Sequence, residues 1–422
     1  MPSSQAIFWL KVLGTTLLLG LRFVWIVPAA ALRYWLRRLL PGKGAERPAL
    51  FFYSQVVWQE VWQRPQEFAR GMACKCPVIF FGPAQVHRLY DTMRKKRWLR
   101  RRDYKEGCGL TVITPLQFSG EYKSRLIEAV NRVLIRAEAR WVLAPWRRII
   151  FVTNSPFCDD LVECLDYERL VYDVIDEYVS FSWSPQGSGA REGRVLSRAD
   201  LLIAGTWRLW EKKKELHPRC VFVPSGVAFE HFQCNGKPRT TPASLEGLPR
   251  PILGYMGSLS DRIDHQILEK LSEAFPRGSV VLIGPVHGSF GKPPSARNIH
   301  YLGLVDHRVL PDYLSAFDVA LMPFALNEAT RHINPVKTLE YLAAGKPVVS
   351  TRVPDVVRFY SDYLYLADSP DDFVSKVREA LERPQAERIA RGIELARGSS
   401  WGTMVEKMAS ELEALSANDA GE

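Results

Sequence analysis

A lysine and a glutamate three positions apart, Lys337 and Glu340, are the residues of this sequence whose chemistry is easiest to interpret. They fall in a predicted helix of about ten residues, because Asn334 suits an N-cap, Pro335 the first helical position and Gly345 the residue after the end. The N–H groups and the positive dipole end of a helix start favour a diphosphate, and Lys337 would add to that attraction. Glu340, one turn further on, could accept hydrogen bonds from a ribose. The pattern therefore indicates a nucleotide lying along this helix.

The same spacing allows a second interpretation. Lys337 and Glu340 could form an exposed ion pair worth about 0.2–0.5 kcal/mol, and Tyr341, on the same predicted face, could be a packing residue. Asn327 and Thr330 precede the helix, where they could contact a sugar or its phosphates. Spacing alone does not decide between the two interpretations.

Short apolar segments that alternate with helical patterns predict the elements that position these residues. Such an alternation is typical of α/β domains with parallel sheets. A segment rich in Pro and Gly at 233–249 separates a first group of strands from a second. The predicted strands cover 49–54, 78–82, 149–153 and 170–175 in the first group, and 252–258, 280–285, 299–303, 318–324 and 348–351 in the second.

The segment from Glu340 to Val349, which ends in Gly-Lys-Pro-Val-Val, resembles the donor-binding signature of group 1 glycosyltransferases with the GT-B fold. The resemblance implies an α/β chain of two Rossmann-like domains that face each other across a cleft, with Glu340 holding the ribose of a nucleotide sugar. The longer string from Asn334 to Leu342 resembles the branch associated with bacterial exopolysaccharide and cell-wall polysaccharide synthesis. The resemblance is good over 250–402, partial over 50–232 and absent over 1–45.

One position departs from the group 1 pattern. Eight residues before Glu340, where the family has a second acidic residue that contacts the donor sugar, this chain has His332. A histidine can still hydrogen-bond a sugar hydroxyl, or pair with a uronic carboxylate when it is protonated. His332 is therefore retained as a catalytic candidate, and the sugar stays open.

The resemblance implies roles for further residues. Gly257 and Ser258 match the donor-side loop after the first strand of the second domain, and the loop after the strand of Leu302 would face the nucleobase. The run from Trp62 to Gln66 would lie on the acceptor side, with Arg64 available for a phosphate. The same residues are also consistent with a capped helix start that leaves Arg64 on the surface without a ligand.

Asp176 is the candidate general base. It follows a predicted strand, and the carboxyl ends of parallel strands are where ligands bind. A carboxylate there could take the proton from an acceptor hydroxyl, although a helix-capping aspartate would have the same pattern. We expect Lys337 and the helix start to stabilise the leaving diphosphate electrostatically, with no metal and no cofactor besides the nucleotide diphosphate sugar, for which UDP is expected.

Residues 6–36 are nearly all apolar and long enough to cross a hydrocarbon core of about 30 Å. Lys11, Arg22 and Arg33 recur every eleven residues, which aligns them along one side of a helix. This stripe favours a helix lying in the membrane interface, with a single-span anchor as the alternative. A cleaved signal peptide fits less well, because no basic segment precedes the apolar run. The interfacial anchors would be Trp9, Trp25, Tyr34 and Trp35.

The charge of +10 is unevenly distributed over the 422 residues. Residues 1–150 hold 26 Lys and Arg against 9 Asp and Glu, or +17, whereas the remainder holds 30 against 37, or −7. With the apolar start, this favours an anionic membrane surface as partner and no nucleic acid, at the cytoplasmic face of the inner or plasma membrane. Seven scattered cysteines without zinc spacing predict reduced thiols.

Together these patterns predict a membrane-associated glycosyltransferase that moves a sugar from a nucleotide diphosphate sugar to a lipid-linked or polysaccharide acceptor. A nucleotide-sugar epimerase is one alternative. A catalytically idle GT-B-like membrane adaptor of a polysaccharide assembly complex is another, because His332 replaces an acidic residue. The expected domains are a membrane-associated helix and basic linker over 1–45, an acceptor domain over 46–235, a nucleotide-sugar domain over 236–398, and a helix over 399–422 that returns to the first domain.

Overall fold

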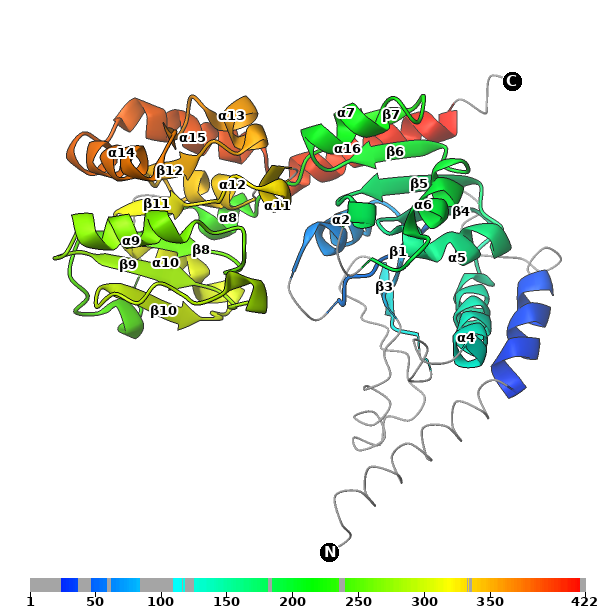
Figure 1. Ribbon diagram of the computed structural model, residues 1–422. Helices are drawn as coiled ribbons and strands as arrows, with labels where there is room; N and C mark the ends of the chain where they lie inside the picture. The colour runs from blue at the N-terminus through cyan, green and yellow to red at the C-terminus, as the bar shows by residue number, and fades with distance from the viewer. Residues whose placement is uncertain are drawn as a thin grey trace, which may run out of the picture. The chain divides into compact units, whose positions relative to one another are not determined.

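The chain folds into two compact units (Figure 1). Unit 1 comprises residues 1–204, 212–221 and 409–422, and unit 2 comprises 205–211 and 222–408. The computed structural model describes residues 24–36, 47–58, 62–83, 109–115, 117, 125–180, 184–234, 240–331, 333 and 336–417.

Unit 1 is built on a seven-stranded sheet with the order β3-β2-β1-β4-β5-β6-β7. Neighbouring strands from β3 to β6 are parallel. Its central strands are buried along their whole length, as expected for a parallel sheet that is covered on both faces. The elements are β1 Ala49–Tyr53, α2 Arg64–Met72, β2 Val78–Phe81, β3 Leu110–Ile113, α4 Arg125–Leu143, β4 Ile149–Thr153, α5 Asp159–Cys164, β5 Arg169–Val174, α6 Ser188–Leu196, β6 Leu201–Ala204 and β7 Cys220–Phe222. The helix α7 Trp207–Lys213 begins in unit 2 and ends in unit 1.

Unit 2 is built on a six-stranded sheet with the order β10-β9-β8-β11-β12-β13, in which every neighbouring pair is parallel. The order reverses between β8 and β11, which is the arrangement that opens a ligand crevice in doubly wound folds. The elements are α8 Phe229–Phe232, β8 Ile252–Met256, α9 His265–Ala274, β9 Ser279–Ile283, β10 Ile299–Gly303, α10 Leu310–Ala316, β11 Val319–Met322, α11 Glu328–Arg331, α12 Lys337–Ala343, β12 Val348–Thr351, α13 Pro354–Tyr360, β13 Tyr365–Ala367, α14 Pro370–Glu382, α15 Ala386–Gly398 and α16 Trp401–Ala417.

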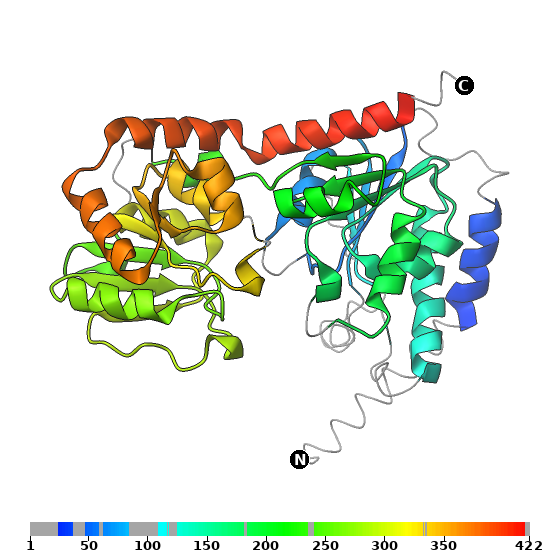
Figure 2. The ribbon, with the colours of Figure 1, turned by 45° about the horizontal axis from the view of Figure 1, so that its top comes forward.

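Residues 24–36 form a helix that lies beside α4 within unit 1 (Figure 2). The earlier part of the expected membrane helix, with Trp9, Lys11 and Arg22, lies outside the described residues. In the part of the chain that the structure describes, no helix combines the length and the apolarity needed to cross a membrane.

The helix α12 is described from Lys337, with Val336 as its N-cap, and the N–H groups of Leu339 and Glu340 both donate to the carbonyl of Val336. The predicted start at Asn334 and Pro335 lies outside the described residues. At the other end Gly345 has a φ of +67° and donates to Leu342, while the next N–H reaches back to Tyr341. These two bonds form a Schellman motif, which needs a residue that tolerates a positive φ.

Backbone packs directly on backbone where β8 and β9 end. The N–H of Gly257 donates to the carbonyl of Ile283, and the N–H of Gly284 donates to Gly303 at the end of β10. A Cβ built on Gly284 would lie 1.9 Å from the carbonyl oxygen of Gly257, and its φ is +142°. Only glycine fits there, so the Gly-x-x-Gly segment that ends β8 is held by its neighbour strand.

We predict that Gly284→Ala destabilises the protein by about 2 kcal/mol or more, because the Cβ clashes with the Gly257 carbonyl and the backbone conformation disfavours a side chain. Denaturant unfolding of the variant would measure the loss. Gly288→Ala is the matched control, since nothing lies within 4 Å of a Cβ built there. Equal stability of the two variants would contradict the packing described here.

Candidate functional site

The hydroxyl of Tyr341 fastens α12 to the end of β8. It accepts a hydrogen bond from the N–H of Met256 at 2.8 Å and donates to the carbonyl of the same residue at 3.3 Å. The side chain is fully buried, and this burial raises the pKa of Tyr341 well above its usual value. Tyr341 is therefore a structural residue, which corrects the expectation that it contacts the nucleotide sugar. Its role is to hold α12 against the strand that leads into Gly257 and Ser258.

Glu340, one residue earlier on α12, is almost buried. Its carboxylate has an exposed fraction of 9% and accepts from Nζ of Lys337 at 2.7 Å, while Lys337 retains 27%. The interpretation as an exposed surface pair is therefore wrong. A carboxylate with a single ionic partner in such a position retains acceptor capacity for ligand hydroxyl groups.

The predicted donor loop lies at the carboxyl edge of the same sheet. Ser258 is exposed and follows Gly257, and its carbonyl accepts from the buried hydroxyl of Tyr255 at 3.2 Å. Leu302 is half-buried within β10, where it packs against the core of unit 2. Unit 2 thus brings the loop after β8 and the helix bearing Glu340 together through the bond between Tyr341 and Met256.

Asn327 and Thr330 cap α11 instead of presenting free polar groups. The N–H of Asn327 donates to Oγ1 of Thr330 at 3.1 Å, and Oδ1 of Asn327 accepts from the N–H of Thr330 at 3.1 Å. This reciprocal pattern is that of a capping box. Nδ2 of Asn327 donates to Asp261, and Oγ1 of Thr330 donates to Ala325. Both residues position the turn, and Thr330 is buried, while the expected contact of the exposed Asn327 with the sugar stays a prediction. His332 and Asn334 lie outside the described residues.

A stacked pair of histidines near Glu340 escaped the sequence analysis. The rings of His231 on α8 and His307 after β10 stack at 4.6 Å, and Nε2 of His231 donates to the His307 carbonyl at 2.9 Å. Partial burial, together with His231 and Lys337, lowers the pKa of His307, although Glu340 acts in the opposite direction. The His307 ring follows the strand whose loop was expected to face a nucleobase. No local pattern could indicate this pair, because its members are 76 residues apart.

The lysine of the Gly-Lys-Pro-Val-Val segment has a structural role. Nζ of Lys346 donates to the carbonyls of Ser315 and Phe317 at 2.6 and 2.9 Å, at the end of α10. Burial lowers the pKa of this amine. Lys346 therefore joins the segment before β12 to α10, and Glu340 remains the candidate residue for contacting the nucleotide sugar.

In unit 1 the guanidinium of Arg64 lies inside the protein. It donates through Nε and Nη2 to the carboxylate of Asp173 on β5, at distances down to 2.7 Å, and the exposed fractions of the two side chains are 6% and 0%. It also lies 4.5 Å from the ring centre of Phe68. The positive charge is therefore balanced internally, which corrects both the expected phosphate contact and the alternative of a surface arginine.

Polar residues line up where the order of the unit 1 sheet reverses, between β1 and β4. Three neighbouring strands are aligned at Tyr53, Thr153 and Tyr172, and the next residue on each strand is polar: Ser54, Asn154 and Asp173. Nδ2 of Asn154 donates to Ser54 at 3.2 Å. Among the described residues, Oδ1 of Asn154 and Nη1 of Arg64 are buried without a hydrogen-bond partner. A hydroxyl group, which both donates and accepts, suits either atom.

Asp176 follows β5 at the same carboxyl edge and is exposed. The next residue, Glu177, belongs to a buried network: Nζ of Lys213 lies 3.5 Å from Glu177 and 2.7 Å from Glu192. Asp176 therefore lies next in sequence to an acid that belongs to this network.

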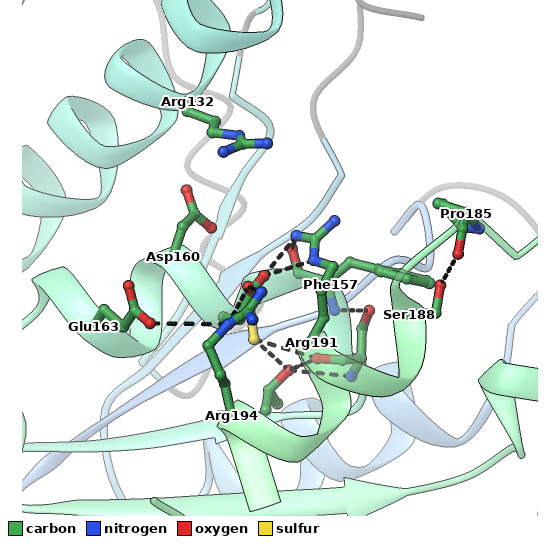
Figure 3. Close-up of polar contacts among 12 residues, drawn as sticks. Arg132, Phe157, Asp160, Glu163, Pro185, Ser188, Arg191 and Arg194 are labelled. Carbon is green, nitrogen blue, oxygen red and sulfur yellow. Dashed lines mark hydrogen bonds and ion pairs between the residues drawn. The ribbon is translucent and has the colours of Figure 1, made fainter.

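A second charged cluster braces α5 against α6 (Figure 3). Asp159 accepts from Arg191 at 2.7 Å and from Arg194 at 2.5 Å, and Arg191 also donates to the carbonyl of Phe157 at 2.8 Å. Burial alone would raise the pKa of Asp159, but the two arginines hold it below the usual value. Burial raises the pKa of the neighbouring Asp160. Each cation of this brace has an acidic partner, so we interpret the cluster as structural.

Two parallel Rossmann-like sheets, the second with a nearly buried glutamate on a helix beside the carboxyl edge, define the architecture of a GT-B nucleotide-sugar protein. Residues 262–400 match the family described as glycosyl transferase-like. This match, over about a third of the chain, agrees with the resemblance of the second unit to group 1 glycosyltransferases with the GT-B fold. A stretch of 201 residues, 45% of this chain, is 28% identical to a Bacillus subtilis (strain 168) protein named as the teichuronic acid biosynthesis glycosyltransferase TuaH. The matched stretch spans half of that relative's own length.

Solved structures share the fold at low sequence identity. Sucrose-phosphate synthase from Thermosynechococcus elongatus superposes with a TM-score of 0.66 at 15% identity, covering 88% of this chain and all of that one. Anabaena HepE in complex with UDP gives 0.60 at 12%, covering 87% and 100%. The trehalose-6-phosphate protein from E. coli bound with UDP-2-fluoro glucose gives 0.61 at 13%, covering 86% and 98%. The predicted α/β GT-B fold with two parallel Rossmann-like sheets is therefore confirmed, whereas the membrane association of the N-terminal helix stays a prediction.

We predict that Arg64→Ala lowers the free energy of unfolding by about 3–5 kcal/mol, because it leaves the fully buried carboxylate of Asp173 without its cation. Arg70→Ala on the same helix is the control: Arg70 is 53% exposed in its pair with Glu67. Its loss should cost less than about 1 kcal/mol. Urea denaturation of both variants would test this, and an effect of Arg64→Ala as small as that of Arg70→Ala would contradict the buried ion pair with Asp173.

Proposed function

We propose that the protein transfers a sugar from a UDP-sugar to a hydroxyl group of a lipid-linked or polysaccharide acceptor in cell-envelope polysaccharide synthesis. The donor would bind at the carboxyl edge of the unit 2 sheet. UDP is favoured because two of the fold relatives are described with UDP or a UDP-sugar bound. The acceptor class is suggested by the name of the Bacillus subtilis relative, a teichuronic acid biosynthesis glycosyltransferase.

The observation that carries the proposal is the state of Glu340. Its carboxylate is largely removed from water, has Lys337 as its ionic partner, and sits on a helix that Tyr341 fastens to β8. A carboxylate held in this way costs stability unless a ligand uses it. We assign to Glu340 the two hydroxyl groups of the ribose, whose donors match its two oxygens.

Lys337 would then act on the leaving group. Its ammonium already lies beside Glu340 and keeps about a quarter of its side chain exposed, which leaves room for a second anionic partner. As the sugar departs, negative charge grows on the diphosphate, and a cation fixed nearby lowers the energy of that state more than the energy of the bound donor. His231 and His307 would form the wall on the nucleobase side.

Asp176 would accept the proton from the attacking hydroxyl. Asp176 is exposed, and it follows β5 by two residues at the carboxyl edge of the sheet. In this assignment unit 1 receives the acceptor, and the buried polar atoms of Asn154 and Arg64 suit acceptor hydroxyl groups better than phosphates, because the charge of Arg64 is already balanced.

We predict that Glu340→Ala weakens UDP binding by about 10–150-fold, the equivalent of losing hydrogen bonds to a charged group. Calorimetric titration of UDP, GDP and dTDP into the full chain would measure this, with UDP binding most tightly to the wild type. Glu379→Ala is the matched control, because Glu379 forms the same i,i+3 pair with Lys376 at 2.9 Å but is 38% exposed.

Unchanged UDP affinity in Glu340→Ala would remove the basis of the donor site. Wild-type chain that binds none of the three nucleotides would instead favour the catalytically idle adaptor. Release of free UDP without acceptor, with interconversion of the sugar, would favour an epimerase.

We predict that Asp176→Asn lowers sugar transfer by at least about 100-fold while UDP binding stays unchanged, since a base acts on the acceptor and not on the nucleotide. The assay follows the radiolabelled sugar of UDP-glucose, UDP-galactose and UDP-N-acetylglucosamine into isolated cell membranes as the acceptor source. Glu215→Gln, an exposed acid of the same unit, is the control. Full transfer by Asp176→Asn would exclude it as the base.

A further inference from the structure

The helix over residues 24–36 has two different sides. One side is closed: Ala30 is 0% exposed, and Tyr34 is half-buried. The other side is open, with Trp25 75% exposed, Leu32 59% and Trp35 64%. Positions 25, 32 and 35 are separated by seven and three residues, which places them on one face of an α-helix. Large apolar side chains so exposed on one face indicate a surface that is covered in use.

The closed side is fastened to unit 1 by polar contacts. The hydroxyl of Tyr34 accepts from the N–H of Asp166 at 2.7 Å, so Tyr34 points into the protein and is not the membrane anchor that the sequence suggested. The guanidinium of Arg33 lies 4.5 Å from the ring centre of Trp141 on α4. Arg140, one residue earlier on α4, lies 5.9 Å from the ring of Tyr34. These contacts fix which face of the helix is left open.

The sequence around the open face is rich in arginine. Residues 24–36 contain one arginine and no acid, and residues 125–148, which include α4, contain six arginines and two glutamates. Three of these arginines form ion pairs, with Glu128, Asp160 and Glu168 as their partners. The apolar sequence also continues toward the N-terminus through residues 6–23. An apolar face with tryptophans, arginines around it and further apolar chain leading into it matches the chemistry of an anionic phospholipid surface.

We propose that the face formed by Trp25, Leu32 and Trp35 lies in the headgroup region of an anionic bilayer, with the helix parallel to the membrane plane. The orientation follows from the closed side. A helix standing across the bilayer would carry the contacts of Tyr34 with Asp166, and of Arg33 with Trp141, into the hydrocarbon. There charged and hydrogen-bonding groups are costly. The inference rests on the proposed function only for the membrane-linked acceptor; the face itself is defined by the exposed residues.

Leu32→Asp tests the face, because it places a charge at its centre without touching the contacts of Tyr34. The matched control is Leu216→Asp, a leucine 60% exposed elsewhere in unit 1. Full-length chains would be sedimented with vesicles of phosphatidylglycerol and phosphatidylcholine, and with vesicles of phosphatidylcholine alone. We expect wild type and Leu216→Asp to bind the anionic vesicles, and Leu32→Asp to bind at least about tenfold more weakly. Binding to phosphatidylcholine alone should be weaker for all three chains.

Undiminished vesicle binding by Leu32→Asp would overturn the proposal. So would a wild-type chain that is dimeric without lipid and becomes monomeric on Leu32→Asp, since a second copy would then cover the face. UDP titration of the same variants separates this inference from the proposed function: Leu32→Asp should bind UDP like the wild type. A wild type that binds vesicles but no nucleotide would contradict the function and leave the lipid face standing.

The orientation has its own measurement. Lipids brominated close to the headgroup or deep in the acyl chain quench tryptophan fluorescence according to depth, and the signal missing from Trp25→Phe/Trp35→Phe isolates these two side chains. For a helix in the membrane plane, we expect the shallow bromines to quench more strongly. Stronger quenching by the deep bromines would overturn the parallel orientation.

Discussion

The paired hydrogen bonds between the Tyr341 hydroxyl and the backbone of Met256 are the contact on which the candidate site of unit 2 depends. One side-chain oxygen satisfies the N–H and the carbonyl of the same residue, so it fixes both the distance and the rotation of α12 relative to β8. Glu340 precedes this tyrosine on the helix, and Gly257 follows this methionine on the strand. The two halves of the proposed donor site are therefore coupled through a single phenol, within a core where it has no water to compete with it.

The two units handle buried charge differently. In unit 1 three buried acids have strong cationic partners: Asp173 has Arg64, Glu192 has Lys213, and Asp159 has two arginines. In unit 2 the ionic partner of Glu340 among the described residues is the ammonium of Lys337, which is itself partly in water. Closed ionic networks stiffen a scaffold, whereas an incompletely satisfied carboxylate prepares a site for a ligand that brings its own donors.

The local parts of this structure were predictable from the sequence. Strands at 149–153, 299–303 and 348–351 have the predicted bounds, and Gly345 ends its helix as its backbone freedom suggests. Apolar runs and special backbone conformations are properties of neighbouring residues, so a single sequence contains them. The strands β3 and β13 were not predicted, because their short runs of four and three residues carry little periodicity.

The functional details that failed depend on partners far away in the chain. Arg64 meets Asp173 109 residues later, and Tyr341 meets Met256 85 residues earlier, so a pattern of neighbours cannot show that either polar group is already engaged. Asn327 and Thr330 are a different case. Their spacing of three residues is that of a capping box, and it could have been recognised as such before a sugar was considered.

The hydrogen bond between Tyr34 and Asp166 also fixes the distance between unit 1 and any surface on which the helix over residues 24–36 lies. A helix that is fastened along its length, and not tethered through a flexible linker, keeps unit 1 about 10 Å from whatever its outer face rests on, the thickness of one helix with its side chains. If that surface is a bilayer, the edge of the unit 1 sheet stays within a narrow range of heights above the lipid phosphates. The distance between the acceptor sugar and the membrane would then affect which acceptors are used, in addition to their chemistry. A sugar attached close to its lipid and the far end of a long polysaccharide chain would not reach unit 1 equally well.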